Sequence, residues 1–502
     1  MCKISVLKNR QKIWIPFLLI VVTFVYARGQ QSMVMPIANH DTTSNYFSVK
    51  ANGRLLSTAQ YKDIHYTSFQ QSGNVTIIIK CSEKINDFII SPLSKNIRGK
   101  VVGKNSIQFN LPQPSYCVIK VNNKNRLFLF AEQFSKDAIQ GNVNIQNYNI
   151  DTTGKTLNTI AIQRAINETS FKRQTLFFPA GIYKTGRLTI PSHGKIFLAA
   201  GALLKASDDL ANFVTSEHQR SKGFINIVNA EDVTIRGLGV IDGNGRQLRD
   251  KYGDGARMRL VFLNGCKNVS INGVIQRDPG SWNTQIMYSQ NVAFKHVKLL
   301  NDVALSNTDG FDPDASLFVS IENCFAYCGD DNVAIKITQD TVANSITSDI
   351  SVTGCVFLTR KSSLKVGTES RGLTIKNILF ENNDVILSDR GMALYCSDGA
   401  VYNNIKYINN NFEENYPDTK RSGIFFEINK RNPNSKIGVM KKIVIKNCSF
   451  QVPFPNLSTI AGFDEEHKID VTIDHLKIAG NLSSGFPDGM NKRSPYSEIL
   501  IK

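Results

Sequence analysis

The chain has 502 residues, a formal net charge of +17 and nine cysteines. This length exceeds one ordinary domain, so we expect at least two. The positive charge could attract nucleic acid, anionic membranes or acidic polysaccharides, or serve only solubility. Lysine and arginine are scattered, without a polybasic arm or a nucleic-acid-binding motif, so nucleic acid is the least favoured partner, and the charge favours an anionic glycan. No second cysteine pair accompanies Cys324 and Cys328 to complete a zinc site, and we expect no metal cluster.

Residues 1–29 have the pattern of a secretory signal. A basic start precedes the apolar stretch IWIPFLLIVVTFVY and the small-residue sequence ARG. Removing this segment takes away five basic residues and no acidic one, which lowers the formal charge from +17 to +12. The apolar run is too short for a permanent membrane span. We therefore predict a secreted protein, extracellular or periplasmic, without a membrane span in the mature chain.

Residues 30–135 contain runs that alternate between apolar and polar positions and are separated by turn residues. Such runs predict a small N-terminal β-sandwich, and they read YFSVKANGRLL, NVTIIIKCS, SIQFNL and YCVIKVNNKNRLFLFA. Export permits disulfides, so Cys81 and Cys117 could pair, or they could remain buried free thiols. A packing or spacing role is favoured for this domain, and carbohydrate binding is the alternative.

Residues 136–502 carry a repeated strand pattern. Apolar residues at helical spacing in 157–169 first predict a short helix that closes the end of the domain. From residue 233 on, a short unit recurs. Each unit begins with two apolar residues separated by one other residue, and it ends with Asn, Gly or His followed by a small or apolar residue. Nine such units start 23 to 38 residues apart: VTIRGL, VSINGV, VAFKHV, VSIENC, ISVTGC, LTIKNI, IKYINN, IVIKNC and VTIDHL. This repeat predicts a right-handed parallel β-helix, whose coils stack ~4.8 Å apart.

Three cysteines occupy one position of this repeat. Cys324, Cys355 and Cys448 are the last residues of their units. The corresponding last residue of the unit LTIKNI is Ile378. The shared position predicts an inward apolar stack rather than disulfide bridges.

Five aspartates lie in two short segments, SNTDGFDPDA (306–315) and YCGDDNVAIK (327–336). Asp309 and Asp330 are about one coil apart, so stacked coils would bring them together, and Asp331 could join them through a turn or bulge. Three neighbouring acids repel, so at least one should hold its proton near neutral pH while another activates water. This is the chemistry of glycoside hydrolysis, and calcium ligation or a polar turn are the alternatives.

The chain resembles the polygalacturonases of glycoside hydrolase family 28 over roughly residues 145–480. The resemblance is carried by NTDGFD (307–312), GDD (329–331), GLGVIDGNG (237–245), IAIQRAI (160–166) and FFPAGIYKTG (177–186). It implies that Asp330 donates the proton, that Asp309 and Asp331 activate water, and that the reaction inverts the anomeric carbon without a cofactor. A separation near 5 Å between the acids would by itself favour retention, so inversion rests on the resemblance.

Two departures from the family pattern concern substrate binding. Ser362 stands where those enzymes have the histidine of Gly-His-Gly, and GMALYC (391–396) replaces the Arg-Ile-Lys that grips a uronate carboxylate. Arg390 and Lys365 are the candidates for the missing positive charge. The related family 49 of dextranases and isopullulanases also has three aspartates without that histidine, a segment similar to DDNVAIKI, and an N-terminal β-sandwich.

The candidate sugar-binding residues are Lys336, Lys365, Glu369, Arg390 and Trp282. We predict a glycoside hydrolase that cuts a polysaccharide internally, for which an anionic plant or algal glycan is one candidate substrate. The alternatives are an α-glucan hydrolase of the dextranase type, a polysaccharide lyase and a non-catalytic glycan-binding β-helix. Asp312 and Asp314 are expected to matter less than the three catalytic candidates and to serve as controls.

Overall fold

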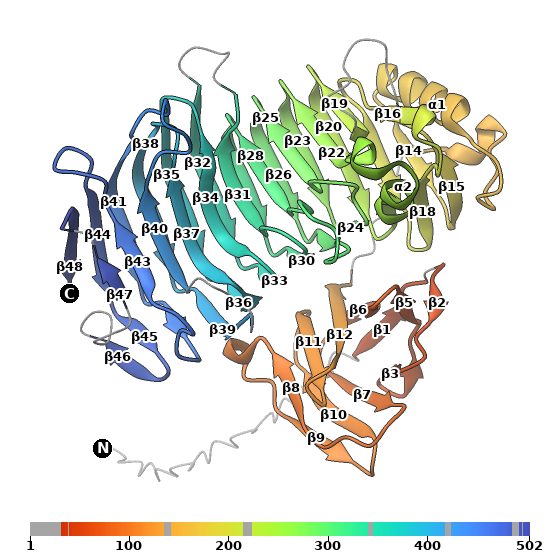
Figure 1. Ribbon diagram of the computed structural model, residues 1–502. Helices are drawn as coiled ribbons and strands as arrows, with labels where there is room; N and C mark the ends of the chain where they lie inside the picture. The colour runs from red at the N-terminus through yellow and green to blue at the C-terminus, as the bar shows by residue number, and fades with distance from the viewer. Residues whose placement is uncertain are drawn as a thin grey trace, which may run out of the picture.

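The computed structural model describes residues 32–38, 40–134, 142–213, 223–339, 345–416, 423–483, 491–493 and 495–502. The predicted signal at residues 1–29 lies outside these ranges. No helix within them is long and apolar enough to cross a membrane. The protein is a long parallel β-helix, and smaller, mainly antiparallel sheets that precede it in the chain lie along its side, which confirms the predicted fold class (Figure 1).

The N-terminal module consists of two packed sheets. The larger sheet contains β1 (Met33–Pro36), β2 (Thr42–Thr43), β5 (Thr58–Tyr61), β6 (Ile64–Ser72), β8 (Phe88–Ser91), β11 (Tyr116–Val121) and β12 (Asn125–Gln133). The smaller sheet, in the order β4-β3-β7-β10-β9, contains β3 (Phe47–Ala51), β4 (Arg54–Leu55), β7 (Val75–Cys81), β9 (Gly99–Val102) and β10 (Ser106–Leu111). Cys81 and Cys117 are buried free thiols in the apolar core between the sheets, so they do not form the disulfide that the sequence left open.

The β-helix has three parallel faces, here called sheets 1, 2 and 3, to which each coil contributes strands in that order. Sheet 1 contains β13 (Asn142–Asn144), β14 (Thr175–Phe178), β17 (Lys195–Leu198), β20 (Glu231–Gly237), β23 (Lys267–Asn272), β26 (Gln290–Lys295), β29 (Leu317–Glu322), β32 (Ile346–Thr353), β35 (Thr374–Glu381), β38 (Val401–Ile408), β41 (Val439–Lys446), β44 (Ile469–Asp474) and β48 (Ser497–Ile501). The nine repeat units of the sequence are the successive strands from β20 to β44.

Sheets 2 and 3 have shorter strands. Sheet 2 contains β15 (Gly181–Thr185), β18 (Ala202–Ala206), β21 (Val240–Asp242), β24 (Ile275–Arg277), β27 (Lys298–Leu300), β30 (Phe325–Cys328), β33 (Val356–Thr359), β36 (Asp384–Ser388), β39 (Asn411–Asn415), β42 (Ser449–Phe450), β45 (Leu476–Ile478) and β46 (Asn481–Ser483). Sheet 3 contains β16 (Leu188–Thr189), β19 (Gly223–Val228), β22 (Arg259–Asn264), β25 (Thr284–Met287), β28 (Phe311–Asp314), β31 (Val333–Ile337), β34 (Ser362–Ser370), β37 (Arg390–Cys396), β40 (Ile424–Ile428), β43 (Ser458–Ala461) and β47 (Asn491–Arg493).

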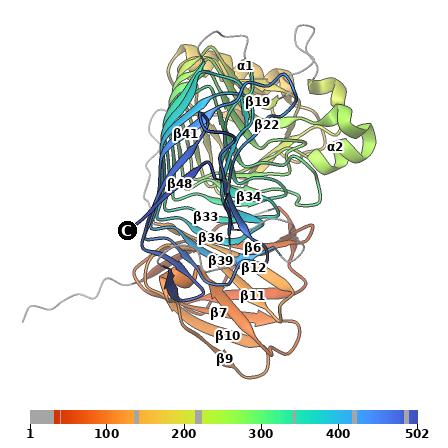
Figure 2. The same ribbon diagram turned by 60° about the vertical axis from the view of Figure 1, so that its left-hand side comes forward.

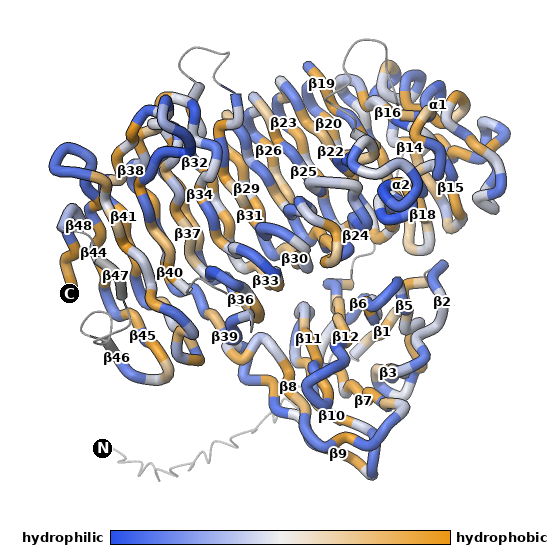
Figure 3. Tube along the Cα trace, viewed as in Figure 1, coloured by the Kyte–Doolittle hydropathy of each residue, from blue (hydrophilic) through white to orange (hydrophobic). Residues whose placement is uncertain are grey.

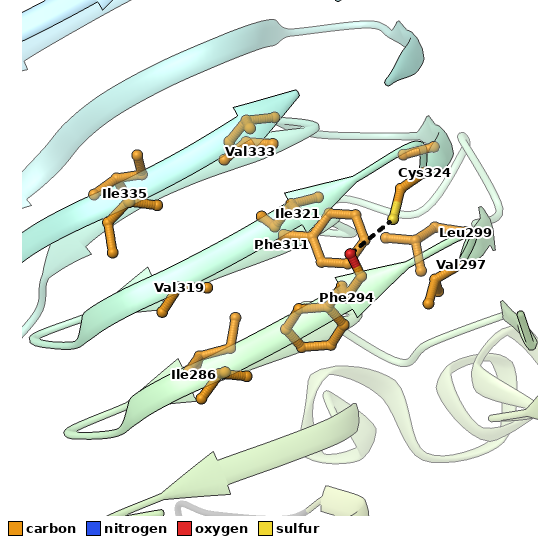
Figure 4. Packing of buried hydrophobic residues seen from close by; sticks show 14 of the residues in the cluster. Ile286, Phe294, Val297, Leu299, Phe311, Val319, Ile321, Cys324, Val333 and Ile335 are labelled. Atoms are coloured by element: carbon orange, nitrogen blue, oxygen red, sulfur yellow. Dashed lines mark hydrogen bonds between the residues drawn. The ribbon is translucent and has the colours of Figure 1, made fainter. Parts of the chain in front are cut away.

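Rows of apolar side chains fill the inside of the β-helix. Val292 pairs with Val319, which pairs with Ile350, and all three are at most 1% exposed. Figure 4 shows Phe294 and Ile321 of the next inward row facing Phe311 of sheet 3, and Figure 3 shows the matching alternation of apolar and polar residues along the strands. Full burial of each such side chain is worth roughly 1.5–3 kcal/mol, so the stacked rows hold the coils together.

One register prediction is wrong. Cys324, Cys355 and Cys448 are buried free thiols, as the repeat indicated. Ile378, however, pairs with Ile350 rather than lying in the cysteine row, and Asn383 takes that position and accepts a hydrogen bond from the Cys355 amide at 3.0 Å. The reason is that β35 alternates along its whole length, and a period of two by itself does not fix which apolar residue starts the unit.

Among the described residues, two α-helices lie outside the sheets. Helix α1 (Thr159–Phe171) contacts the first coils and covers the open end of the β-helix, as the sequence predicted. Helix α2 (Gly245–Tyr252) projects from the side of the β-helix (Figure 2). The 3₁₀ helices are η1 (Leu93–Lys95), η2 (Ile145–Tyr148), η3 (Leu210–Phe213) and η4 (Gly253–Ala256).

The N-terminal module packs on the outer face of sheet 2. Phe128 and Phe130 contact Phe325, each with ring centroids 5.0 Å apart. Beside this apolar contact, Lys298 forms a buried ion pair with Glu132 at 2.6 Å. The module also reaches the corner between sheets 2 and 3, where Lys62 pairs with Asp278 and Asp302. The acidic motifs lie at the same corner.

Candidate active site

The three predicted catalytic aspartates meet at the corner between sheets 2 and 3. Asp309 lies just before β28, and Asp330 with Asp331 lies in the turn between β30 and β31. One carboxylate oxygen from each residue lies within 4.8 Å of the others. Phe311 pairs with Val333, so the register aligns Asp309 with Asp331, whereas the sequence placed Asp330 on the rung beside Asp309. The turn brings Asp330 to the same place.

A buried lysine links Asp309 to a fourth acid. Lys336 Nζ lies 3.1 Å from Asp309 Oδ2 and 2.8 Å from Asp312 Oδ1, and the lysine is 3% exposed. Burial raises the pKa of Asp309, and it raises the pKa of Asp312 far above its usual range, while Lys336 opposes both shifts. Burial would lower the pKa of Lys336, but the two carboxyl groups raise it overall. Lys336 therefore stays charged between them.

Asp331 is held as a carboxylate. Its Oδ2 lies 2.6 Å from Lys365 Nζ, and its Oδ1 accepts a hydrogen bond from the Ser362 backbone N–H at 2.9 Å. Burial would raise the pKa of Asp331, but the positive charges of Lys365 and Arg390 outweigh it, so the pKa is lowered. The position that has histidine in the resembling enzymes thus contributes a backbone donor here.

Asp330 is the member of the cluster that holds a proton near neutral pH. Burial raises its pKa to about 7, and the neighbouring charges of Asp331 and Asp309 add to the shift. Unlike Asp309 and Asp331, it is partly exposed. The corner therefore combines a protonated, accessible carboxylic acid with a buried carboxylate, which is the pairing that general acid–base catalysis needs.

Asp330 and Asp331 line a pocket of about 390 Å³. Three cationic side chains, Lys361, Lys365 and Arg390, line the same pocket, and Glu427 of β40 is its other acidic residue. Arg390 donates a hydrogen bond to the Tyr395 hydroxyl at 2.6 Å and pairs with Asp389 at 3.2 Å. Three cations therefore share the pocket lining with three acidic residues.

The other two predicted sugar-binding residues have partners within the protein. Glu369 pairs with Arg431 at 3.5 Å and is not part of the pocket lining. The half-buried Trp282 ring lies against Lys336, whose Nζ is 3.7 Å from the ring centroid. This cation–π contact occupies one face of the ring and positions Lys336 beside Asp309.

Sequence reasoning missed Lys361 and Glu427, and it misjudged two controls. Asp312 and Asp314 are 0% and 1% exposed, and Asp314 accepts hydrogen bonds from Thr338 and Gln285. Replacing either would remove a buried partner, so neither is a suitable control. The sequence did not indicate that all four residues of β28 are buried.

The same three oxygens are close enough to surround a cation, which was one alternative for the motif. The ammonium groups of Lys336 and Lys365 already lie 3.1 Å and 2.6 Å from two of the carboxylates. Lys336 and Lys365 therefore already provide counter-charges for Asp309 and Asp331.

Residues 169–484 match Glycosyl hydrolases family 28, and the chain belongs to this family. It is similar to a protein of Vitis vinifera named "Probable polygalacturonase", with 32% identity over 37% of this chain and 42% of the relative. It is also similar to endo-xylogalacturonan hydrolase A of Aspergillus tubingensis, with 30% identity over 45% of this chain and 56% of that protein. The chain spans about half the length of the curated relatives it matches.

Solved structures share the fold at low sequence identity. The family 28 exopolygalacturonase of Yersinia enterocolitica aligns with a TM-score of 0.60 and 16% identity, over 85% of this chain and 96% of that one. Dex49A from Penicillium minioluteum aligns with a TM-score of 0.64 and 13% identity, over 93% and 96% of the two chains. The fold is therefore shared with a family 49 protein as well, in agreement with the second resemblance.

Proposed function

We propose that this protein hydrolyses glycosidic bonds in the galacturonan backbone of pectic polysaccharides. The observation that carries the proposal is the unequal protonation of Asp330 and Asp331 in one pocket whose lining also includes three cations. Membership of family 28 supports the reaction class, and the names of the curated relatives support a galacturonan as the substrate.

In the proposed mechanism, Asp330 donates its proton to the glycosidic oxygen as the bond from the anomeric carbon to that oxygen breaks. A water molecule forms the new bond to the anomeric carbon and transfers a proton to Asp331, with Asp309 helping to orient the water. Lys365 keeps Asp331 ionised until this transfer. Solvent exchange then restores the proton on Asp330 and the charge on Asp331.

The cations of the pocket support an acidic sugar as the substrate. Lys361, Lys365 and Arg390 line the pocket together with Asp330 and Asp331, and they would attract a uronate carboxylate. They stand in for the Arg-Ile-Lys that the sequence lacks at 391–396, and of the three Arg390 offers the planar donor geometry that suits a carboxylate. Lys365 and Arg390 also have partners within the protein, Asp331 and Asp389, so a bound uronate carboxylate would add to these contacts.

Internal cleavage, inversion at the anomeric carbon and export through residues 1–29 belong to the same proposal. Sheets 2 and 3 continue through further coils before and after the coils that contain the catalytic aspartates. This length of surface supports a groove for several sugar units. On one side, Arg249 of α2 donates a hydrogen bond to the Ser306 carbonyl at 2.9 Å, so this helix borders the groove. Release of monomers alone would contradict internal cleavage.

The test is hydrolysis of a defined set of polymers by the purified full-length chain. Polygalacturonate should release reducing ends while its viscosity falls early, and NMR of the first product should show the inverted anomer. Dextran and pullulan should not be cut, and no unsaturated uronide should absorb in the ultraviolet. Cleavage of dextran instead would favour the α-glucan alternative, and an unsaturated product would favour the lyase.

A further inference from the structure

A second cavity, of about 630 Å³, lies on the N-terminal module, away from the catalytic corner. It lies between the segment that follows η1 and the edge of the smaller sheet formed by β9 and β10. We call it the module groove and define it by six of its polar lining residues, Lys95, Asn96, Arg98, Lys100, Gln108 and Asn110.

Positive charge dominates the module groove. Lys95, Arg98 and Lys100 are exposed, and no aspartate or glutamate belongs to the lining. The sequence from residue 88 to residue 131 contains seven lysines and arginines and no acidic residue. Within the described part of the chain, Arg98 and Lys100 form no ion pair, in contrast to the buried lysines of the catalytic corner. An anion that binds here would therefore not compete with a protein carboxylate.

Carboxamides lie next to these cations. Gln108 pairs across the β9–β10 ladder with Lys100, so the two side chains lie side by side on the outer face of the sheet. Arg98 donates a weak hydrogen bond, at 3.5 Å, to the Asn96 side chain. A carboxamide both donates and accepts, which suits sugar hydroxyl groups, and a guanidinium fork suits a carboxylate.

We propose that the module groove is a second polysaccharide site that binds a stretch of polyuronate chain. This inference rests on the proposed function for the identity of the anionic sugar. A uronate unit presents one carboxylate and several hydroxyl groups, which match the cations and carboxamides of the groove. Nucleic acid is less well matched, because the aromatic residue of the lining, Phe109, is 3% exposed and cannot stack on a base.

The groove is fixed in position relative to the β-helix. Glu413 of β39 accepts hydrogen bonds from the Leu93 backbone N–H at 2.6 Å and from the Ser91 hydroxyl at 2.5 Å. These contacts attach the start of η1 to β39 of sheet 2. A polymer held in the groove would therefore stay tethered to the β-helix that contains the pocket, which raises its local concentration for catalysis.

The experiment compares two double variants of the full-length chain that lose the same charge. Arg98→Ala with Lys100→Ala removes two cations of the groove. Lys267→Ala with Lys441→Ala removes two exposed lysines of sheet 1 and is the matched control. Both are assayed for KM and kcat on polygalacturonate and on a short oligogalacturonide, and for retardation in native gels that contain polygalacturonate, dextran or no polymer.

The groove variant should raise KM for the polymer about fivefold and lose most of its retardation, as expected for two exposed charge contacts. Its kcat and its activity on the short oligomer should stay unchanged, and the control should behave like the wild type. Equal weakening in both variants would overturn the inference, because the attraction would then be general. Unchanged polymer binding with weaker binding to duplex DNA or anionic vesicles would also overturn it.

The two proposals fail in different ways. If the wild type releases no reducing ends from polygalacturonate, but the groove variant alone loses retardation on it, the proposed function is wrong and the groove assignment stands. If hydrolysis proceeds and the groove variant matches the wild type in both KM and retardation, the groove assignment is wrong and the hydrolase remains.

Discussion

Two parts of this molecule gather lysine and arginine, and they differ in burial and in partners. At the catalytic corner, Lys336 is 3% exposed and lies between two carboxyl groups. In the module groove, Arg98 and Lys100 are exposed and no acidic residue lines the cavity. The same residue types thus set the protonation of neighbouring acids in one place, whereas in the other they face solvent.

The difference shows that burial decides what a charge does. In a poorly solvated site a nearby charge changes which form of a carboxyl group is stable, so Asp330 and Asp331 shift in opposite directions. At an exposed site water screens the charge, and its effect is attraction of a mobile anion. Substitutions at the two places should therefore differ in the property they change and in the size of the change.

The largest effect is expected from Asp330→Asn. The amide keeps the shape of the side chain but cannot donate the proton, so kcat on polygalacturonate should fall by about 10²–10⁴-fold. The thermal midpoint should change little by comparison. Asp87→Asn, at an exposed position of the N-terminal module, is the control and should retain full turnover. Activity close to the wild type in Asp330→Asn would refute its role as the acid.

Removing the buried cation should strongly destabilise the fold. Lys336→Met leaves Asp309 and Asp312 without their shared counter-charge, which should lower the free energy of unfolding by about 3–5 kcal/mol in urea titrations. Adding Asp312→Asn should recover part of this loss. The exposed pair of Lys295 with Glu322, at 2.9 Å, provides the contrast, and Lys295→Met should cost at most about 1 kcal/mol. Equal losses would contradict the role of burial.

The pKa of Asp330 predicts a pH dependence that points in one direction. Its carboxyl group titrates near 7 when folded and near 4 when unfolded, so between these values the folded state binds more protons. The free energy of unfolding should therefore fall as pH rises from about 4 to 7, by at most about 4 kcal/mol. Subtracting the curve of Asp330→Asn isolates this contribution, and a flat difference would disprove the shift. Activity should decline above pH 7.

The smallest effect is expected at the module groove. Arg98→Ala with Lys100→Ala should change the free energy of unfolding by less than about 0.5 kcal/mol, because exposed charges without ion pairs contribute little. Thermal unfolding of this variant and of the wild type should nearly superimpose. A loss of several kcal/mol would mean that these cations hold the module together, and the contrast with the catalytic corner would disappear.

Sheet 1 could be predicted because its signal is local. Alternation along each strand and the repeated turn residue near its end specify nine successive strands from β20 to β44, and they specify a stacked cysteine row. The strands of sheets 2 and 3 lack this signal, since many of their side chains are covered on both faces. Ile378 shows the limit, because alternation alone did not determine its register.

The sequence by itself determined the fold class, the family resemblance and the three aspartates, because these depend on short patterns in the chain. Only the tertiary structure decided that Asp309 aligns with Asp331, that Lys336 and Lys365 neutralise the two buried acids, and that Asp330 keeps its proton at an accessible position. The physical reason is that protonation depends on distances and burial between residues from different coils, and loop lengths that vary from coil to coil set those distances.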